Sequence, residues 1–249
     1  MSTASTQPST ASTQPTGTRP RNDPAQYDDL AAQWWQPDGA FQTLHWIAAA
    51  RARAIPSATR TGAVLVDVAC GGGLLAPHIA GLGYRHIGVD LSSPSLRLAG
   101  AHGVTPIRAD ALRLPLRDGV ADVVVAGEML EHVPDLPRVV RELIRVLRPG
   151  GTLVADTLAD TAIARWVTIT VGERINGLWA GLHDGSLYVN RAQLRREASA
   201  HGVHLELSGL RPVIRDVASW LLGRRPDVRV VRTRSTAILF QAVGRKEAP

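Results

Sequence analysis

The sequence is poor in cysteine and in long apolar runs. Cys70 is the one cysteine among 249 residues, so an internal disulfide and a cysteine-rich zinc module are excluded, which fits a reducing cytoplasm. No stretch approaches the roughly 18 uninterrupted apolar residues of a membrane span. The N-terminus lacks the basic segment and apolar run of a secretory signal. We therefore expect a cytoplasmic protein that is neither exported nor embedded in a bilayer.

The charge is basic without a concentrated nucleic-acid-binding stripe. The net charge is +6 and the pI about 10.5, but the basic residues are almost all Arg and are scattered along the chain. The densest cluster has no interleaved aromatic residues and comprises Arg224, Arg225, Arg229, Arg232 and Arg234. This pattern is typical of a solvated basic surface, so we expect no nucleic-acid partner.

The change of composition along the chain predicts an N-terminal tail followed by one domain. Residues 2–8 and 9–15 both read STASTQP, a composition with nothing to bury, and we predict a disordered Ser/Thr/Ala/Gln/Pro-rich tail over 1–24. The domain then covers 25–249, beginning with a helical cap over 25–56. Its hydrophobic content of 45% supports a sizeable core.

From residue 63 onward, short β-branched runs alternate with helical segments. The runs are "AVLVDVA", "RHIGVDL", "VTPIRAD", "ADVVVAGEM" and "GTLVADT", with predicted helices over 74–82, 93–102 and 136–147. This alternation is typical of a parallel sheet covered on both faces. Two later runs, 203–214 and 234–245, predict an antiparallel pair. The fold class is therefore α/β, a Rossmann-like doubly wound sheet of about seven strands, mostly parallel, with an antiparallel C-terminal pair.

The segment "VDVACGGGLLA" places a strand, a glycine-rich turn and a helix in succession. Gly71 and Gly73 let the backbone approach a ligand closely, and the N–H groups that open the helix face the same crevice. The spacing from Gly71 to Ala76 also satisfies the dinucleotide fingerprint, so a NAD-binding oxidoreductase is one alternative.

Acidic residues at three successive strand ends favour a different cofactor. Asp67 would repel a pyrophosphate but attract the cationic amino group of an amino-acid moiety, which suits S-adenosylmethionine. Asp90 ends the second strand, where a carboxylate binds ribose hydroxyls. Asp110, followed by Ala111, ends the third strand and is a candidate for the adenine amino group. A protein that binds this cofactor without turnover stays a further alternative.

The glycine-rich segment and the three strand-end acids resemble those of class I S-adenosylmethionine-dependent methyltransferases. A closer resemblance is to the O-methyltransferases of ubiquinone biosynthesis, which methylate polyprenylated hydroxyphenols and catechols. It is carried by "WWQPDGAFQTLH" (34–45), "DVACGGGLLA" (67–76), "GEMLEHVPD" (127–135) and "TLADTAIARW" (157–166), and it extends from Tyr27 to Tyr188. The resemblance implies an O-methyltransferase whose acceptor is a phenolic or catechol-like small molecule, prenylated in the family. C-methylation of a quinone or isoprenoid stays an alternative.

The resemblance also implies roles for individual residues. Arg51 is expected to bind the cofactor carboxylate, the backbone of Ala69 to line its site, Asp90 to hold the ribose, and Gly127 to lie beside the cofactor. Two positions differ from the family: Ala69 stands where a glycine is usual, and Gly127 stands where the family has a bulkier side chain. These differences put the substrate preference in doubt.

The "EMLEHVPD" block leaves three interpretations open. In the family, the corresponding glutamates and histidine are implicated in binding a divalent cation, which implies Glu128, Glu131 and His132 as ligands of Mg²⁺, Mn²⁺ or Zn²⁺. Alternatively, His132 is a metal-free general base tuned by Glu131. In the third interpretation the block only forms the loop, with Asp135 capping the next helix.

A segment near the end of the resemblance suggests contact with a membrane surface. Residues 162–181 are apolar but interrupted by charges and glycines, a pattern that suits an amphipathic helix at an interface. The resemblance gives the insert 158–187 a role as a lid or membrane contact, which makes the expected location cytoplasmic with peripheral contact at the inner membrane face. The sequence gives no indication of an oligomeric state.

Overall fold

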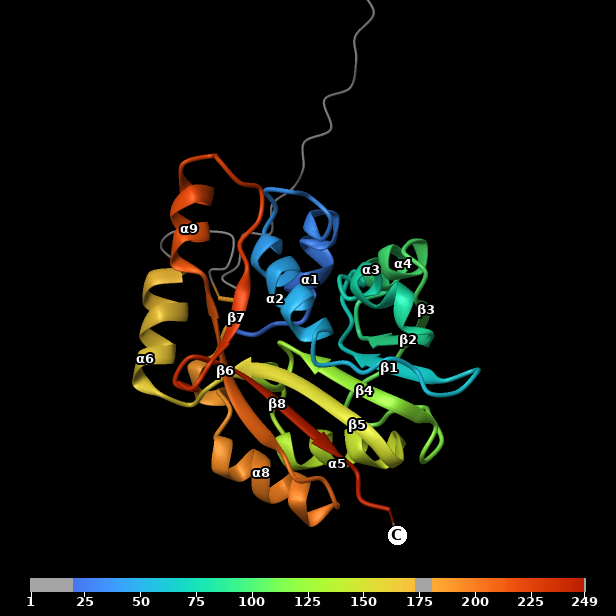
Figure 1. Ribbon diagram of the computed structural model, residues 1–249. Helices are drawn as coiled ribbons and strands as arrows, with labels where there is room; N and C mark the ends of the chain where they lie inside the picture. The colour runs from blue at the N-terminus through green and yellow to red at the C-terminus, as the bar shows by residue number, and fades with distance from the viewer. Residues whose placement is uncertain (1–19, 173–180, 249) are drawn as a thin grey trace, which may run out of the picture.

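The computed structural model describes residues 20–172 and 181–248. In this part of the chain the strands form one twisted sheet with helices on both of its faces (Figure 1). The strands are β1 Val64–Val68, β2 Arg85–Asp90, β3 Thr105–Arg108, β4 Ala121–Gly127, β5 Leu147–Leu158, β6 Glu206–Pro212, β7 Val230–Thr233 and β8 Leu239–Arg245. Most of the predicted disordered tail, residues 1–19, lies outside the described residues.

The strand order is β3-β2-β1-β4-β5-β8-β6-β7. Strands β1 to β5 pair in parallel, whereas β8 runs antiparallel to β5 and to β6. The α/β Rossmann-like fold with antiparallel C-terminal strands is therefore confirmed. The described sheet has one strand more than predicted, because β7 pairs with the outer edge of β6. The order places β1 and β4 at the centre, where the chain reverses its direction of winding and α/β proteins bind their ligands.

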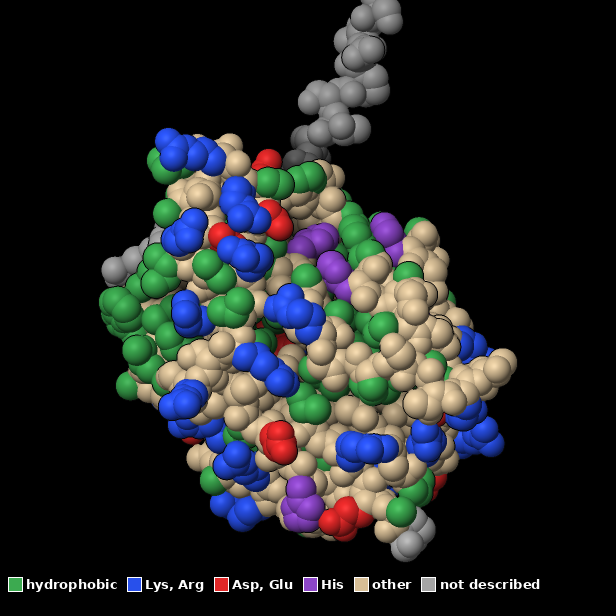
Figure 2. Space-filling model, in the orientation of Figure 1, with side chains coloured by type: hydrophobic (Ala, Val, Ile, Leu, Met, Phe, Trp, Pro, Cys, Tyr) green, Lys and Arg blue, Asp and Glu red, His purple; other side chains and the backbone are tan. Residues whose placement is uncertain are grey.

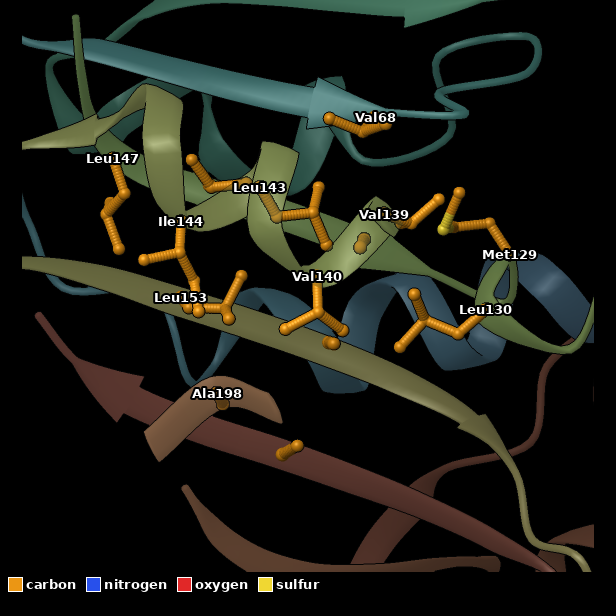
Figure 3. Close-up of a cluster of buried hydrophobic side chains, with 14 of the residues drawn as sticks. Val68, Met129, Leu130, Val139, Val140, Leu143, Ile144, Leu147, Leu153 and Ala198 are labelled. Carbon is orange, nitrogen blue, oxygen red and sulfur yellow. The ribbon is translucent and has the colours of Figure 1, made fainter. Parts of the chain in front are cut away.

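Both faces of the sheet are covered, and β4 shows this residue by residue. Val123 and Val125 pack in a core cluster with Ile55 and Leu75, on the face of the N-terminal helices. Val124 and Ala126 point the opposite way, into the larger cluster beneath the helix Leu136–Val146 (α5). Figure 3 shows side chains of α5, Val139, Val140, Leu143 and Ile144 among them, in contact with this second face. Such two-sided burial explains why β4 is continuously apolar from Val123 to Ala126.

The predicted helices are present with shifted ends. Helix α5 stops at Val146 because the following Leu147, Pro149 and Gly150 already belong to β5. Helices α8 and α9 were not predicted: α8 is rich in Arg and Ala, and the first residue of α9, Ile214, was included in the predicted run 203–214. The remaining helices are α1 Ala25–Asp29, α2 Gln42–Ala52, α3 Ala76–Ile79, α4 Ser93–Ala101, α6 Ala162–Arg165, α8 Arg191–Ala200 and α9 Ile214–Leu221.

The segment predicted to lie at a membrane surface, 162–181, is helical over 162–172, and Gly181 lies in a turn. Helix α6 continues as a wider π-helical turn over Trp166–Gly172. Residues 173–180 of the predicted segment lie outside the described residues. Among the helices that are described, none has the length and apolar content needed to cross a bilayer.

Candidate active site

The glycine-rich turn after β1 is built on unusual backbone conformations. Ala69, Gly71 and Gly73 all have a positive φ, at 56°, 52° and 81°. A Cβ on Gly71 would lie 2.4 Å from the Trp34 ring, and one on Gly73 would lie 2.9 Å from the backbone of Ala99. Glycine is therefore required at both positions, whereas Ala69 adopts a left-handed conformation that disfavours a side chain.

The helical cap folds directly onto this turn. The Trp34 ring lies against Gly71 and Gly72, stacks on Phe41 with ring centroids 3.8 Å apart, and donates from Nε1 to Ser95 Oγ at 2.9 Å. Trp35 donates from Nε1 to the carbonyl of Gly72 at 2.9 Å. The two tryptophans thus bring the N-terminal helices over the predicted cofactor-binding turn.

The three predicted acids differ in their surroundings. Asp90 accepts hydrogen bonds from the backbone N–H groups of Gly71 and Ser92, both at 2.8 Å, so it connects the end of β2 to the glycine-rich turn. Each carboxylate oxygen has a second lone pair that can accept a ribose hydroxyl. Burial raises the pKa of Asp90. Asp67 is buried, with its Oδ2 atom 3.3 Å from Nε2 of His86.

Asp110 lies at the same edge of the sheet but is exposed. The backbone N–H of Ala109 donates to the carbonyl of Asp90, which brings the start of this loop beside the end of β2. The Asp110 carboxylate itself accepts from the N–H of Leu112 at 2.8 Å, and Ala111 is half-buried next to it. Its position at the carboxyl edge suits the predicted adenine contact, which stays a prediction.

Arg51, at the end of α2, forms a buried ion pair with the sheet. Its Nε and Nη2 atoms donate to the two carboxylate oxygens of Asp156 at 2.6 and 2.7 Å, and Asp156 is fully buried in β5. The guanidinium lies flat against Gly127, the register partner of Asp156 at the end of β4. Nη1 takes no part in this pair, so it can donate to a cofactor carboxylate without breaking the contact with Asp156.

Two glutamates follow β4. Glu128 has a positive φ of 51°, and its N–H donates to the carbonyl of Asp156 at 2.8 Å. Glu131 is fully buried and accepts from the Thr157 hydroxyl at 2.7 Å. Each glutamate has one buried oxygen, Oε1, that lacks a hydrogen-bond partner among the described residues. Burial, with a smaller effect of neighbouring carboxylates, raises the pKa of Glu128 well above its usual range and that of Glu131 to about 7.

His132 has both ring nitrogens engaged. Nδ1 lies 2.6 Å from Oδ1 of Asn22, and Nε2 lies 3.3 Å from the hydroxyl of Tyr27. Burial, followed by the nearby His183, lowers the pKa of His132 to about 3. The ring is therefore neutral near pH 7.

The three predicted metal ligands are not brought together as a set. Within 20–172 and 181–248, the structure has no group of three His, Cys, Asp or Glu side chains arranged to bind an ion. Glu128 and Glu131 retain buried oxygens suited to a cation, but His132 could bind one only by giving up Asn22 or Tyr27. Asp135 accepts from the N–H of Arg138 at 3.0 Å, so the predicted cap of α5 is present.

The overall charge of the site favours a cationic ligand. Arg51 interacts electrostatically with Asp156, Asp67 and Glu128. Further acidic pairs lie close together, Glu128 with Glu131 and Asp90 with Asp67. Neutralising these carboxylates with a positively charged ligand would offset part of the cost of burying them. A sulfonium cofactor with an α-amino group meets this requirement, whereas a diphosphate does not.

Sequence reasoning missed three residues of the site. Asn22 was assigned to the tail, Tyr27 to helix packing, and Asp156 to the interior of a strand. An acid inside the apolar run "TLVADTL" is the signal that could have identified Asp156. The sequence contains no comparable signal for Asn22, because its partner His132 lies 110 residues away.

Comparison with protein families supports the prediction that the chain is a methyltransferase. Residues 66–155 match the family model described as a methyltransferase domain. The chain is 35% identical over 196 residues to a ubiquinone biosynthesis O-methyltransferase of Thiobacillus denitrificans, covering 75% of this chain and 84% of the relative. It is 37% identical over 190 residues to the protein of the same name from Methylococcus capsulatus, covering 72% and 79%.

Solved structures support the fold. A SAM-dependent methyltransferase from Thermotoga maritima superposes with a TM-score of 0.63 at 16% identity, covering 90% of this chain and 99% of that one. A [4+2]-cyclase, SpnF, superposes with a TM-score of 0.54 at 21% identity, covering 84% and 83%. Because the same fold carries such different reactions, these likenesses bear on architecture and not on the reaction.

Substituting Gly127 tests the arrangement of Arg51. A Cβ at this position would lie 1.9 Å from Arg51 Cζ, so Gly127→Ala must displace the guanidinium and leave Asp156 buried without its partner. We expect the free energy of unfolding in urea to fall by about 3 kcal/mol, the usual cost of breaking a buried ion pair. Gly81→Ala is the matched control, because a Cβ there has no atom within 4 Å. Equal stability of the two variants would contradict the assignment.

Proposed function

The chain belongs to the ubiquinone biosynthesis O-methyltransferase family, and from that membership we propose that it transfers a methyl group from S-adenosylmethionine to a hydroxyl of a phenolic or catechol-like small molecule. The observation that carries the proposal is the placement of His132 in the turn Leu130–His132 that follows β4, with its Nε2 atom 3.3 Å from a phenol hydroxyl, that of Tyr27. This arrangement combines a site for a cationic donor with a proton acceptor.

The cofactor site proposed from these contacts has three parts. Arg51 would bind the cofactor carboxylate through Nη1, and Asp90 would accept the ribose hydroxyls with its remaining lone pairs. The backbone from Ala69 to Gly73 would lie against the ligand, with Gly127 beside it. When bound, S-adenosylmethionine supplies a methyl group on a positively charged sulfur.

His132 would act on the acceptor. His132 would accept the hydroxyl proton of the phenol at Nε2 and leave the phenol oxygen free to take the methyl group. S-adenosylmethionine would supply that group, and the electron pair of its carbon–sulfur bond would stay on sulfur. Because transfer removes a positive charge from sulfur, the proton arriving on His132 leaves the net charge of the buried site unchanged. Burial lowers the pKa of this imidazole, and Glu131 lies in the same turn.

We expect the purified protein to methylate phenols at oxygen. The measurement is incubation with methyl-labelled S-adenosylmethionine and a panel of catechols, hydroxyquinones and prenylated phenols, with mass spectrometry and NMR locating the methyl group. His132→Gln should lower kcat at least about 100-fold, the usual contribution of a general base. His201→Gln, at an exposed histidine beyond the end of α8, is the control.

Three results would contradict this assignment. Methyl groups found on ring carbon would favour C-methylation. Calorimetric binding of NAD without binding of S-adenosylmethionine would favour an oxidoreductase. Binding of S-adenosylmethionine without turnover on any acceptor would favour a non-catalytic protein.

We also propose that the divalent cation predicted from the sequence would be bound by Glu128 and Glu131, without His132. The support is the pair of unpartnered buried oxygens and the raised pKa of both carboxyls, which a cation would lower again. Such an ion would stabilise the phenolate form of the acceptor.

Thermal stability tests the cation without relying on activity. We expect Mg²⁺ or Mn²⁺ at millimolar concentration to raise the Tm of the wild-type protein, because an ion that binds only the folded state stabilises it. The same ions should leave the Tm of Glu128→Gln unchanged. Glu206→Gln, at an exposed residue of β6, is the control and should respond like the wild type. No shift in the wild type would exclude the site.

We further propose that the protein makes peripheral contact with an anionic membrane surface. Exposed apolar side chains support this on α6 and its continuation, where Ile163 and Trp166 are 49% and 59% exposed, and on α9, where Ile214 and Leu221 are 76% and 71% exposed. Figure 2 shows Lys and Arg side chains gathered over the region of α9 and β7, and hydrophobic side chains over the region of α6. Apolar residues flanked by basic ones are typical of interfacial binding.

Co-sedimentation with vesicles tests this contact. We expect binding to vesicles containing an anionic lipid and weaker binding to purely zwitterionic ones. The double variant Trp166→Ser, Leu221→Ser should reduce binding several-fold, because each substitution removes exposed apolar area. Leu91→Ser, at an exposed leucine outside these helices, is the control. Equal binding by the double variant and the wild type would refute the proposed surface.

A further inference from the structure

Asn22 contacts His132 at two points. Its Nδ2 atom donates to the backbone carbonyl of His132 at 2.9 Å, while its Oδ1 atom lies 2.6 Å from Nδ1 of the same residue. A backbone carbonyl only accepts hydrogen bonds, so the amide nitrogen of Asn22 must face it. The amide oxygen is thereby directed at the imidazole, and the orientation of the Asn22 side chain is fixed by its own partners.

This contact determines the tautomer of the imidazole. An amide oxygen only accepts hydrogen bonds, so Nδ1 of His132 must carry the proton. In a neutral ring the other nitrogen, Nε2, then has the free lone pair. The hydroxyl of Tyr27, 3.3 Å from Nε2, is the donor to that lone pair. Burial and the carboxylates of Glu131 and Asp90 raise the pKa of Tyr27, so the phenol keeps its proton.

Tyr27 thus already makes the contact that a phenolic acceptor needs. Its hydroxyl group donates to Nε2, and it interacts electrostatically with Glu131, Asp90 and Glu128, which mark the cofactor side of the site. The Tyr27 ring stacks on the ring of Phe41, with centroids 6.2 Å apart. An acceptor hydroxyl that gives its proton to Nε2 must take the position of the Tyr27 hydroxyl.

We propose that Asn22 is a positioning residue that holds His132 as the Nδ1–H tautomer, and that the Tyr27 hydroxyl occupies the position that the acceptor hydroxyl takes during methyl transfer. This inference rests on the proposed function of His132 as the proton acceptor. It adds the segment before α1 to the acceptor site, although the sequence placed Asn22 in the tail.

The backbone of Asn22 allows a clean choice of variants. Its φ of 61° is left-handed, a conformation that glycine and aspartate tolerate well, and its N–H donates to the carbonyl of Gly181 at 2.8 Å. Asn22→Gly removes both side-chain hydrogen bonds without straining this backbone. Asn22→Asp keeps an oxygen facing Nδ1–H and loses the donation to the His132 carbonyl.

The tautomer is tested first, on the full-length protein without any acceptor. Long-range ¹H–¹⁵N correlation spectra of the histidine rings distinguish the two neutral forms, and a spectrum of His132→Gln assigns the signal. We expect the Nδ1–H form in the wild type and in Asn22→Asp, and the Nε2–H form to appear in Asn22→Gly. An unchanged Nδ1–H signal in Asn22→Gly would overturn the role of Asn22.

Kinetics test the consequence for the reaction. We expect Asn22→Gly to lower kcat by about 10- to 100-fold while the KM for the acceptor changes less than threefold. The reason is that this variant changes the tautomer of His132 but keeps the imidazole. Asn22→Asp should recover most of kcat. A loss confined to KM, or no recovery in Asn22→Asp, would indicate a purely structural contact and overturn the proposal.

Tyr27→Phe tests the acceptor position. Phenylalanine keeps the ring against Phe41 and removes only the competing hydroxyl, so we expect the acceptor KM to fall several-fold with kcat retained. A lower kcat at unchanged KM would instead make Tyr27 part of the proton path and overturn the assignment. If the wild type binds S-adenosylmethionine but methylates no phenol, the proposed function fails, and the NMR comparison still decides whether Asn22 sets the tautomer.

Discussion

The buried ion pair between Arg51 and Asp156 is the contact on which the geometry of the site depends. It joins the last turn of α2 to β5, so it fixes the helical cap over the carboxyl edge of the sheet. A guanidinium at this depth is stable only with a well-aligned carboxylate, and Asp156 supplies one in bidentate geometry. Gly127 provides the space that the planar group needs. The same guanidinium counteracts the repulsion among the surrounding acids, which would otherwise oppose closure of the cap.

Among the described residues, three with side chains adopt left-handed backbone conformations, and two of them lie where a central strand ends. Ala69 follows β1 and Glu128 follows β4, with φ of 56° and 51°. Each such residue costs on the order of 1 to 2 kcal/mol. The neighbouring contacts hold the strained turns in place: Gly71 N–H bonds to Asp90, and Glu128 N–H bonds to Asp156. The strain therefore lies at the carboxyl ends of the two central strands, β1 and β4, where the winding reverses.

The sequence predicted those parts of the protein that depend on local patterns. Apolar β-branched runs located the core strands, and glycine spacing located the turn after β1, because both are dictated by short-range sterics and burial. Contacts between distant segments were not predictable in this way. The pairing of Arg51 with Asp156 and of Asn22 with His132 depends on how the cap packs on the sheet, and no local pattern encodes that packing. For the same reason the E-x-x-E-H block suggested one metal site, whereas in the fold both ring nitrogens of His132 contact N-terminal residues, Asn22 and Tyr27.

The contacts of the cap also affect the free energy of ligand binding, because a ligand must replace them. Tyr27 bonds to the nitrogen that an acceptor requires, and Trp34 lies against Gly71 and Gly72, where the cofactor is expected. Ligands therefore exchange contacts with the cap instead of filling an open cleft. Such an exchange favours binding only when the new contacts are better than those lost, since a ligand shifts a conformational equilibrium solely by its differential affinity for the two states. A phenol can replace the hydrogen bond of Tyr27 and a cationic cofactor can neutralise the acids, so the pair of ligands is matched to the contacts that the cap gives up. A neutral apolar molecule of the same size would gain neither, so with the proposed function the contacts of the cap would favour polar aromatic acceptors.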